Sequence, residues 1–241
     1  MSELKSDPAV ALVLAGGLGS RMGRPKQFID LLGAPALHYT LRAFEEAPDI
    51  ARIYAVGDQS LIEALVAQSG ISKYAGCAPP GEIRSLSARN GLRLCGGEEE
   101  ETLVLVHDGA RCLVTPDLIA RVVATFARDR GVDGVVPALP VSDTIKVAGD
   151  GVVLDTLDRT KLHAAQTPQA FRLGLYRKVC LGSGEHLRAV TDDASLVERA
   201  GGRVLVIRGE KTNIKLTSPE DLVFAEAILT ARRGVHHGVR S

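Results

Sequence analysis

The sequence predicts an α/β protein, a Rossmann-like three-layer sandwich with a mostly parallel sheet and a protruding β-arm. Residues 9–15 and 102–106 form unbroken apolar runs, which are typical of strands buried on both faces of a parallel sheet. Amphipathic stretches separate such runs, for example 36–47 with Leu37 and Leu41 on one face, and they predict helices. This alternation of strands and helices favours a parallel sheet covered by helices on both faces.

In chain order, we expect strands at 9–15, 50–56, 102–106, 132–139, 203–207 and 213–216. We expect helices at 36–47, 59–68, 82–94, 116–128, 173–181 and 192–200, and a last helix after Pro219. Pro116 stands at the first turn of its helix, where its missing N–H is not needed.

The regular alternation stops near residue 140. Residues 141–171 contain turn signals, Gly149-Asp150-Gly151 and Thr167-Pro168, but no helical pattern. Long excursions of this kind tend to be functional or to mediate association, so we expect a β-arm there. The whole chain, 1–241, is then a single domain with an arm at about 141–171 and a basic, flexible tail at about 232–241.

The charge balance excludes some classes of function. The chain has 29 Lys plus Arg and 29 Asp plus Glu, so it lacks the basic excess of nucleic-acid-binding domains. Any anion site must therefore be local. Residues 1–8 do not resemble a signal peptide, and no apolar run approaches the ~20 residues that span a bilayer. We expect a cytoplasmic protein that binds neither membrane nor nucleic acid.

Cysteines and histidines give no metal-ligand pattern. The cysteines are widely spaced and form no C-x-x-C pair, which argues against a zinc site or a disulfide framework; they are Cys77, Cys95, Cys112 and Cys180. His107 is expected to be a packing or hydrogen-bonding neighbour of Asp108 and not a base.

A glycine-rich loop, 16–26, follows the first predicted strand, where open α/β sheets bind ligands. Glycines let the backbone approach a ligand closely, and its N–H groups can bind phosphate oxygens. Arg21 and Lys26 add two cations, a combination that suits a triphosphate. No Gly-Lys-Ser/Thr P-loop is present, and Met22 stands where a dinucleotide-binding loop needs its third glycine. A tight turn with solvated charges remains the alternative.

Six segments in register resemble one family. The loop 16–27 resembles the signature of sugar nucleotidyltransferases. Further matching segments are 107–111, 143–146, Arg159 with 165–169, 191–194, and 213–222. Together they make the chain, from about 9 to 230, similar to the 2-C-methyl-D-erythritol 4-phosphate cytidylyltransferases. The resemblance implies transfer of CMP from CTP to 2-C-methyl-D-erythritol 4-phosphate, giving 4-diphosphocytidyl-2-C-methyl-D-erythritol and pyrophosphate, in the non-mevalonate isoprenoid pathway.

Two other functions stay open at this point. The Ala-Gly-Gly form of the loop also occurs in ribitol-5-phosphate cytidylyltransferases, although Asp143-Thr144 and Ala165-Gln166 favour the methylerythritol phosphate acceptor. A CTP-binding regulator without turnover is an alternative of a different class. The presence of all the charged residues of the family's site argues against such a regulator; they are Arg21, Lys26, Asp108, Arg159 and Lys215.

The resemblance also implies roles for individual residues. The catalytic set is Arg21, Lys26, Arg159 and Lys215. CTP is bound by Ala15, Gly16, Gly17, Gly19, Gly81, Glu82, Ser87 and Gly109. The acceptor is bound by Arg111, Thr144, Arg159, Thr191 and Lys215. Asp108 is the candidate ligand of Mg²⁺ or another divalent cation, because Mg²⁺ favours one or two carboxylates plus substrate oxygens.

Four of these residues also have an ordinary structural explanation. Asp108 could cap a turn, Lys26 could be a solvated surface lysine, and Lys215 could be a charge at a strand edge. Arg159 could form a surface ion pair with Asp155 or Asp158.

The resemblance implies a homodimer as well, in which the arm carrying Arg159 comes from the neighbouring subunit and completes the partner's site.

Overall fold

The computed structural model describes residues 9–17, 25–182 and 186–237. Within this part of the chain an eight-stranded sheet has the order β10-β7-β11-β6-β1-β4-β5, and β12 pairs with β7. Its strands are β1 (Ala9–Leu14), β4 (Ile50–Val56), β5 (Tyr74–Ala78), β6 (Leu103–Asp108), β7 (Gly134–Pro140), β10 (His163–Ala165), β11 (Gln169–Arg172) and β12 (Val204–Arg208).

The pairing confirms a mostly parallel sheet. The contacts β1–β4, β1–β6, β4–β5 and β7–β12 are parallel. Among the described strands of this sheet, only β10 and β11 run antiparallel to their neighbours. The sheet is therefore mixed, with the returning end of the arm supplying the antiparallel strands.

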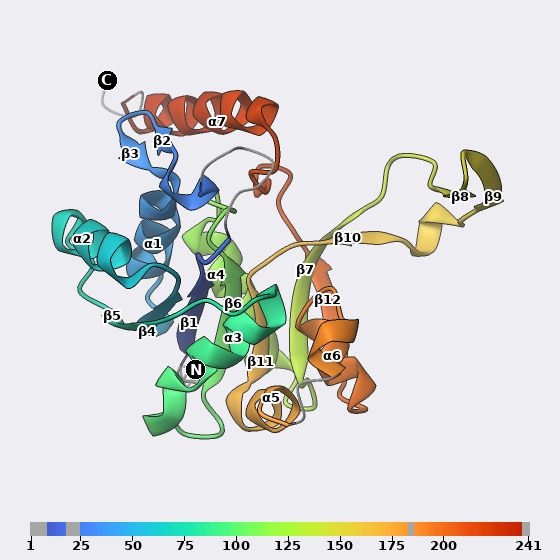
Figure 1. Cartoon of the computed structure of the whole chain (residues 1–241), viewed down its shortest axis with the longest axis horizontal. Coiled ribbons are helices and arrows are strands. Elements are labelled where there is room, and N and C mark those ends of the chain that lie inside the picture. Colours follow the sequence, from blue (N-terminus) through green and yellow to red (C-terminus); the bar gives the residue numbers. More distant parts are fainter. Residues whose placement is uncertain (1–8, 18–24, 183–185, 238–241) are drawn as a thin grey trace.

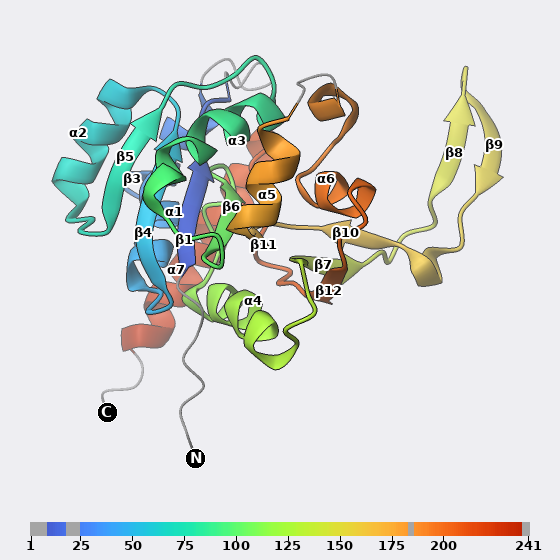
Figure 2. The ribbon, with the colours of Figure 1, turned by 90° about the horizontal axis from the view of Figure 1, so that it is seen from below.

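Helices cover both faces of the sheet (Figure 1 and Figure 2). They are α1 (Ala36–Glu46), α2 (Gln59–Ser69), α3 (Arg84–Leu92), α4 (Pro116–Arg128), α5 (Leu173–Cys180), α6 (Ala194–Arg199) and α7 (Pro219–His237). One apolar cluster joins α1, α2 and α4 to the sheet, and a second joins α3, α5 and α6 to its other face. In β1, Ala11 and Val13 belong to the first cluster, whereas Val10 and Leu12 belong to the second. The unbroken apolar run of this strand thus fills both cores, as predicted.

A third cluster lies at the carboxyl edge of the sheet. There α7 packs on Leu31 of the short strand β2 (Asp30–Leu31), which pairs with β3 (Ala34–Pro35), and on Leu216. Short 3-10 turns complete the described chain: η1 (Lys26–Phe28), η2 (Leu94–Gly97), η3 (Arg159–Lys161) and η4 (His186–Ala189).

The arm is confirmed as an excursion, but it is shorter than predicted. Within 141–171, only the part up to η3 leaves the sheet, because β10 and β11 return to pair with β7 and β6. The projecting part carries a hairpin of β8 (Lys146–Gly149) and β9 (Val152–Thr156) (Figure 1). Its turn contains Asp150 and Gly151 in left-handed conformations, with φ of 50° and 78°.

Three sequence expectations need correction. Residues 213–216 form no strand; they cross the carboxyl edge of the sheet as a loop, held by bonds to other loops. The strand β5 was not predicted, because Tyr-Ala-Gly-Cys-Ala gives only a weak apolar signal. The helix α7 continues to His237, so the expected tail overlaps its end. A single domain over 1–241 stays a prediction.

Candidate active site

The predicted ligand-binding segments meet at the carboxyl edge of the parallel strands. Ala15 follows β1 and donates its N–H to Val56 O of β4 at 2.7 Å. Gly109 follows β6 and donates to Leu14 O of β1 at 2.8 Å. Ligands of open α/β sheets bind in the crevice at this edge, so the fold brings the loop of β1 and the turn after β6 to one place.

Asp108, the last residue of β6, is the centre of a cluster of cations. Its Oδ1 accepts from Arg84 Nε at 2.8 Å, and its Oδ2 lies 2.9 Å from Lys215 Nζ. Arg111 Nε lies 3.7 Å from the same Oδ2. Only 8% of Asp108 is exposed. Burial by itself would raise the pKa of this carboxyl, but Arg84 and Lys215 outweigh it and hold the pKa well below its usual range. The carboxylate is therefore ionised and surrounded by positive charge.

Arg84 connects Asp108 to the interior. Its other hydrogen bond goes from Nη1 to Oδ2 of Asp193, which is fully buried at the start of α6. Oδ1 of Asp193 accepts from the Tyr176 hydroxyl at 2.6 Å. Burial opposes the charge on Arg84, but the two carboxylates raise its pKa above the ordinary value. Sequence reasoning did not assign this residue a role in the site. The only signal was its position beside Gly81 and Glu82.

Lys215 and Arg111 are placed by loop-to-loop bonds instead of strand pairing. Asn213 Nδ2 donates to Thr167 O at 2.8 Å, and Leu216 N donates to Ala110 O at 2.9 Å. Arg111 Nη1 donates to Asn213 O at 3.0 Å. These bonds hold the loop of Lys215 against the turn after β6. The interpretation of Lys215 as a charge at a strand edge is therefore wrong, since no strand forms there.

His107 is a buried structural neighbour, as expected. Its Nε2 lies 3.2 Å from Arg111 O, and its Nδ1 lies 3.0 Å from Thr167 Oγ1. A carbonyl can only accept, so Nε2 carries the proton, Nδ1 accepts from the Thr167 hydroxyl, and that oxygen accepts from Asp108 N. Burial lowers the pKa of His107 to about 4, so the ring is neutral.

This neutral histidine predicts a loss of stability in acid. The unfolded chain takes up the His107 proton near pH 6.5 and the folded chain only near pH 4, so stability present above pH 6.5 is lost across that window. We expect a loss of about 3 kcal/mol in the free energy of unfolding of the ligand-free protein. Urea denaturation at pH 7.5 and at pH 4.5 measures it. If His107→Gln shows the same difference between the two pH values as the wild type, another group is responsible.

The glycine-rich loop is described at both ends. Gln27, which is buried, donates Nε2 to Ala15 O at 2.5 Å and to Gly17 O at 3.1 Å, and this ties η1 to the end of β1. A Cβ on Gly16 would come within 2.3 Å of Pro80 Cβ, so only glycine fits there. Lys26, half-buried, begins η1. The predicted residues Gly19 and Arg21 lie outside the described residues.

Gly81 and Glu82, expected to bind CTP, lie in a tight turn before α3, the helix that carries Ser87. A Cβ on Gly81 would lie 2.6 Å from Leu86 Cβ and 2.8 Å from Ser87 N. Ser87 Oγ accepts from Gly81 N at 3.0 Å and lies 3.1 Å from Ile83 O. The Ser87 hydroxyl thus shapes the turn, and its contact with CTP stays a prediction. Glu82 is exposed and pairs with Arg188 at 2.8 Å.

The remaining predicted acceptor residues are spread more widely. Thr144 and Arg159 are exposed on the arm, which projects from the sheet (Figure 2). Arg159 Nη1 donates to Ser142 O at 2.6 Å. Among the described residues it forms no ion pair with Asp155 or Asp158, contrary to the structural alternative. Thr191 is exposed in the bend before α6.

The described residues contain no cluster of three or more His, Cys, Asp or Glu side chains that could hold a metal by themselves. In the same part of the chain, no helix has the length and apolarity needed to cross a membrane.

Comparisons with known proteins agree on one family. The model of the family described as 2-C-methyl-D-erythritol 4-phosphate cytidylyltransferase matches residues 9–231. A protein of that name from Rubrobacter xylanophilus is 66% identical over 224 residues, covering 93% of this chain and 96% of the relative. One from Geobacillus kaustophilus is 44% identical over 227 residues, covering 92% and 97%. The crystal structure of the Francisella tularensis protein of that name is similar with a TM-score of 0.78 at 29% identity, covering 91% of this chain and 99% of that one.

Proposed function

This chain belongs to the 2-C-methyl-D-erythritol 4-phosphate cytidylyltransferase family, and we propose that it carries out the family's reaction around Asp108. It is a CTP-dependent enzyme of the non-mevalonate isoprenoid pathway. It transfers CMP from CTP to 2-C-methyl-D-erythritol 4-phosphate, giving 4-diphosphocytidyl-2-C-methyl-D-erythritol and pyrophosphate. The proposed location of the active site rests on one observation. The ionised Asp108 lies at the carboxyl edge of the sheet with Arg84, Arg111 and Lys215 around it.

The reaction needs charge neutralisation more than proton transfer. An oxygen of the acceptor phosphate attacks the α-phosphorus of CTP, and the bond to the β-phosphate breaks, so that pyrophosphate leaves with the electron pair. Both reactants are anions, so positioning and positive charge lower the barrier. In this proposal Lys26 and Arg21 hold the triphosphate, and Lys215 neutralises charge at the α-phosphate. Arg111, Thr191 and the arm residues Thr144 and Arg159 hold the acceptor.

The cytidine of CTP is proposed to lie along the closely packed turns at the carboxyl edge of the sheet. Ala15, Gly16, Gly17 and Gly19 would approach the triphosphate, and Gly109 lies beside them in the turn after β6. The close packing of Gly81 and Ser87 supports a rigid turn for the base, with Glu82 beside it.

The residues present fit a divalent cation, for which Mg²⁺ is proposed. Asp108 is ionised, and a carboxylate has about four lone-pair sites, of which Arg84 and Lys215 use two. Since one protein carboxylate suffices when substrate phosphates supply further oxygens, Asp108 would hold the ion. The cation supplies additional positive charge to the phosphates.

A homodimer with composite sites is proposed from the arm. Val152, Val153 and Leu154 on β9 are 62%, 57% and 68% exposed, and apolar side chains gathered on a projecting hairpin are typical of an association surface. Arg159 lies at the foot of the same hairpin and would enter the partner's site. A cytoplasmic location is proposed because CTP is supplied there.

Mixing two inactive variants tests the composite site. We expect Arg159→Ala and Lys215→Ala to be inactive separately and to recover about a quarter of wild-type activity when co-expressed, because half the dimers are mixed and each has one intact site of two. Pyrophosphate release from the purified mixture measures this. If Arg159 acts within its own chain, mixed dimers have no intact site and nothing is recovered.

Parallel assays test the reaction itself. With CTP and Mg²⁺, we expect pyrophosphate release with 2-C-methyl-D-erythritol 4-phosphate and little with ribitol 5-phosphate. Release with ribitol 5-phosphate alone would overturn the acceptor and keep the chemistry. CTP binding without release with either acceptor would contradict the proposed function.

A further inference from the structure

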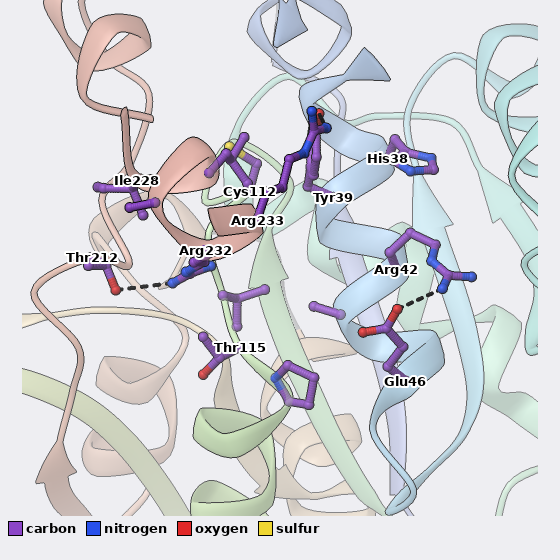
Figure 3. A pocket seen from close by; sticks show the side chains of 15 residues that line it. His38, Tyr39, Arg42, Glu46, Cys112, Thr115, Thr212, Ile228, Arg232 and Arg233 are labelled. Carbon is purple, nitrogen blue, oxygen red and sulfur yellow. Dashed lines mark hydrogen bonds and ion pairs between the residues drawn. The ribbon is translucent and has the colours of Figure 1, made fainter. Parts of the chain in front are cut away.

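An open cavity lies behind the active-site turn, between α1, α7 and the start of α4 (Figure 3). Its volume is about 760 Å³. Small-molecule sites commonly measure about 300–1,000 Å³. Asp108, Lys215 and Lys26 are not among its lining residues, so it is distinct from the proposed CTP site.

The walls of this cavity combine an apolar body with a positively charged side. Ala43 of α1, Val114 before α4, and Ile228 and Leu229 of α7 supply apolar surface. Cys112, 2% exposed, adds to it, and burial raises the pKa of its thiol to about 12, so this side chain stays neutral.

The charged lining residues are three arginines and one glutamate. Arg42 pairs with Glu46 at 2.7 Å, as Figure 3 shows, and Arg233 Nη2 donates to the Tyr39 hydroxyl at 3.1 Å, so the cation considered below is Arg232 on the α7 side. Burial lowers the pKa of Arg232, which indicates that its charge is incompletely hydrated.

The contacts of Arg232 are with neutral oxygens. Its Nη2 donates to Leu113 O at 3.0 Å and to Thr212 Oγ1 at 3.1 Å. Glu210 is the carboxylate that acts on Arg232, and it is paired with Arg121 at 3.0 Å. An anion entering from the cavity would therefore meet a cation that, among the described residues, has no hydrogen bond to a carboxylate.

The same arginine joins two segments that lead into the active site. Cys112 and Leu113 directly follow Arg111, and Thr212 directly precedes Asn213. On the active-site side, Arg111 Nη1 bonds Asn213 O at 3.0 Å. A molecule that contacts Cys112 and Thr212 would thus touch the two segments that carry Arg111 and Lys215, two of the three cations around Asp108.

We propose that this cavity binds a small amphipathic anion, with a flat or branched apolar body and one sulfonate, carboxylate or phosphate group, and that its occupancy changes the affinity of the neighbouring site for CTP. The proposed binding of the anion is independent of the enzyme's activity. The proposed effect on the affinity for CTP rests on the proposed function.

Two related probes test the binding. 8-Anilinonaphthalene-1-sulfonate is an amphipathic anion, and N-phenyl-1-naphthylamine is its uncharged parent. We expect the full-length protein to bind the sulfonate about tenfold more tightly, by fluorescence titration, because of the cationic side. Arg232→Gln should remove this preference and leave the binding of the neutral probe unchanged. Equal affinity of the wild type for the two probes would overturn the assignment of an anion site.

Matched variants on α7 locate the site. Ala231 is exposed and lines the cavity, whereas Ala227 is exposed on the same helix and does not. We expect Ala231→Trp to fill the cavity and to weaken the binding of both probes at least about tenfold. Ala227→Trp should bind both probes as tightly as the wild type does. Both variants should keep the wild-type Tm, since neither position is in a core. If the two variants bind the probes equally, the probes bind elsewhere.

Direct CTP binding separates coupling from competition. We expect the dissociation constant of CTP to change at least about twofold with the sulfonate probe and then to level off at saturation, as coupling between two sites requires. A dissociation constant that rises without limit as probe is added would place the probe in the CTP site. An unchanged dissociation constant would overturn the coupling. A protein that binds CTP and the probe but releases no pyrophosphate would contradict the proposed function and leave this inference standing.

Discussion

Lys215→Ala is expected to lower kcat/KM for cytidylyl transfer about 10²- to 10³-fold. Lys215 Nζ lies 2.9 Å from Asp108 Oδ2 at the carboxyl edge of the sheet, where the negative charge of the reacting phosphates would gather. Removing one preorganised electrostatic group from such a site typically costs a factor of this size. Pyrophosphate release under saturating and limiting CTP measures the effect on kcat and on kcat/KM.

The control for this prediction is another lysine of the same loop. Lys211 is exposed, four residues before Lys215, and has no place in the cluster around Asp108. Lys211→Ala should change kcat/KM less than about twofold. Lys215→Arg keeps the charge but not the compact ammonium group, so it should recover only part of the activity. Equal activity of Lys211→Ala and Lys215→Ala would remove Lys215 from the catalytic set.

Asp193→Ala is expected to destabilise the fold by about 3–5 kcal/mol, because it leaves Arg84 and the Tyr176 hydroxyl without their buried partner. Asp193 is fully buried, so water cannot replace it. For a chain of this size we expect a fall in Tm of roughly 10 °C. Differential scanning calorimetry of the ligand-free protein measures it.

An exposed ion pair provides the comparison. Asp129 lies 2.6 Å from Arg203, and the two side chains are 39% and 54% exposed. Asp129→Ala should therefore leave Tm almost unchanged. If Asp193→Ala is equally mild, the hydrogen-bonded chain from Tyr176 through Arg84 to Asp108 does not stabilise the protein, and Arg84 would be held by its packing.

The elements with strong local patterns could be predicted from the sequence. The predicted helix 116–128 has the bounds of α4, and Pro116 at its first turn is a local signal; the structure adds Thr115, whose side chain caps the helix by accepting from Leu118 N. The strand β1 was predicted from an apolar run that fits burial on both faces. The strand β5 was missed and a strand at 213–216 was wrongly predicted, because short weakly patterned segments take their structure from their neighbours.

The candidate site also combines features that could be predicted from the sequence with features that could not. The sequence by itself determined the family, the residue types of the loop at 16–26, and the position of Asp108 at the end of a buried strand, because these are local patterns read along the chain. Only the tertiary structure decided that Arg84 bridges Asp108, 24 residues away, and Asp193, 109 residues away, and that a loop brings Lys215 to Asp108. The physical reason is that charge pairing and burial depend on distances in space, which the order of the chain does not specify until the sheet has fixed which strand ends and loops meet.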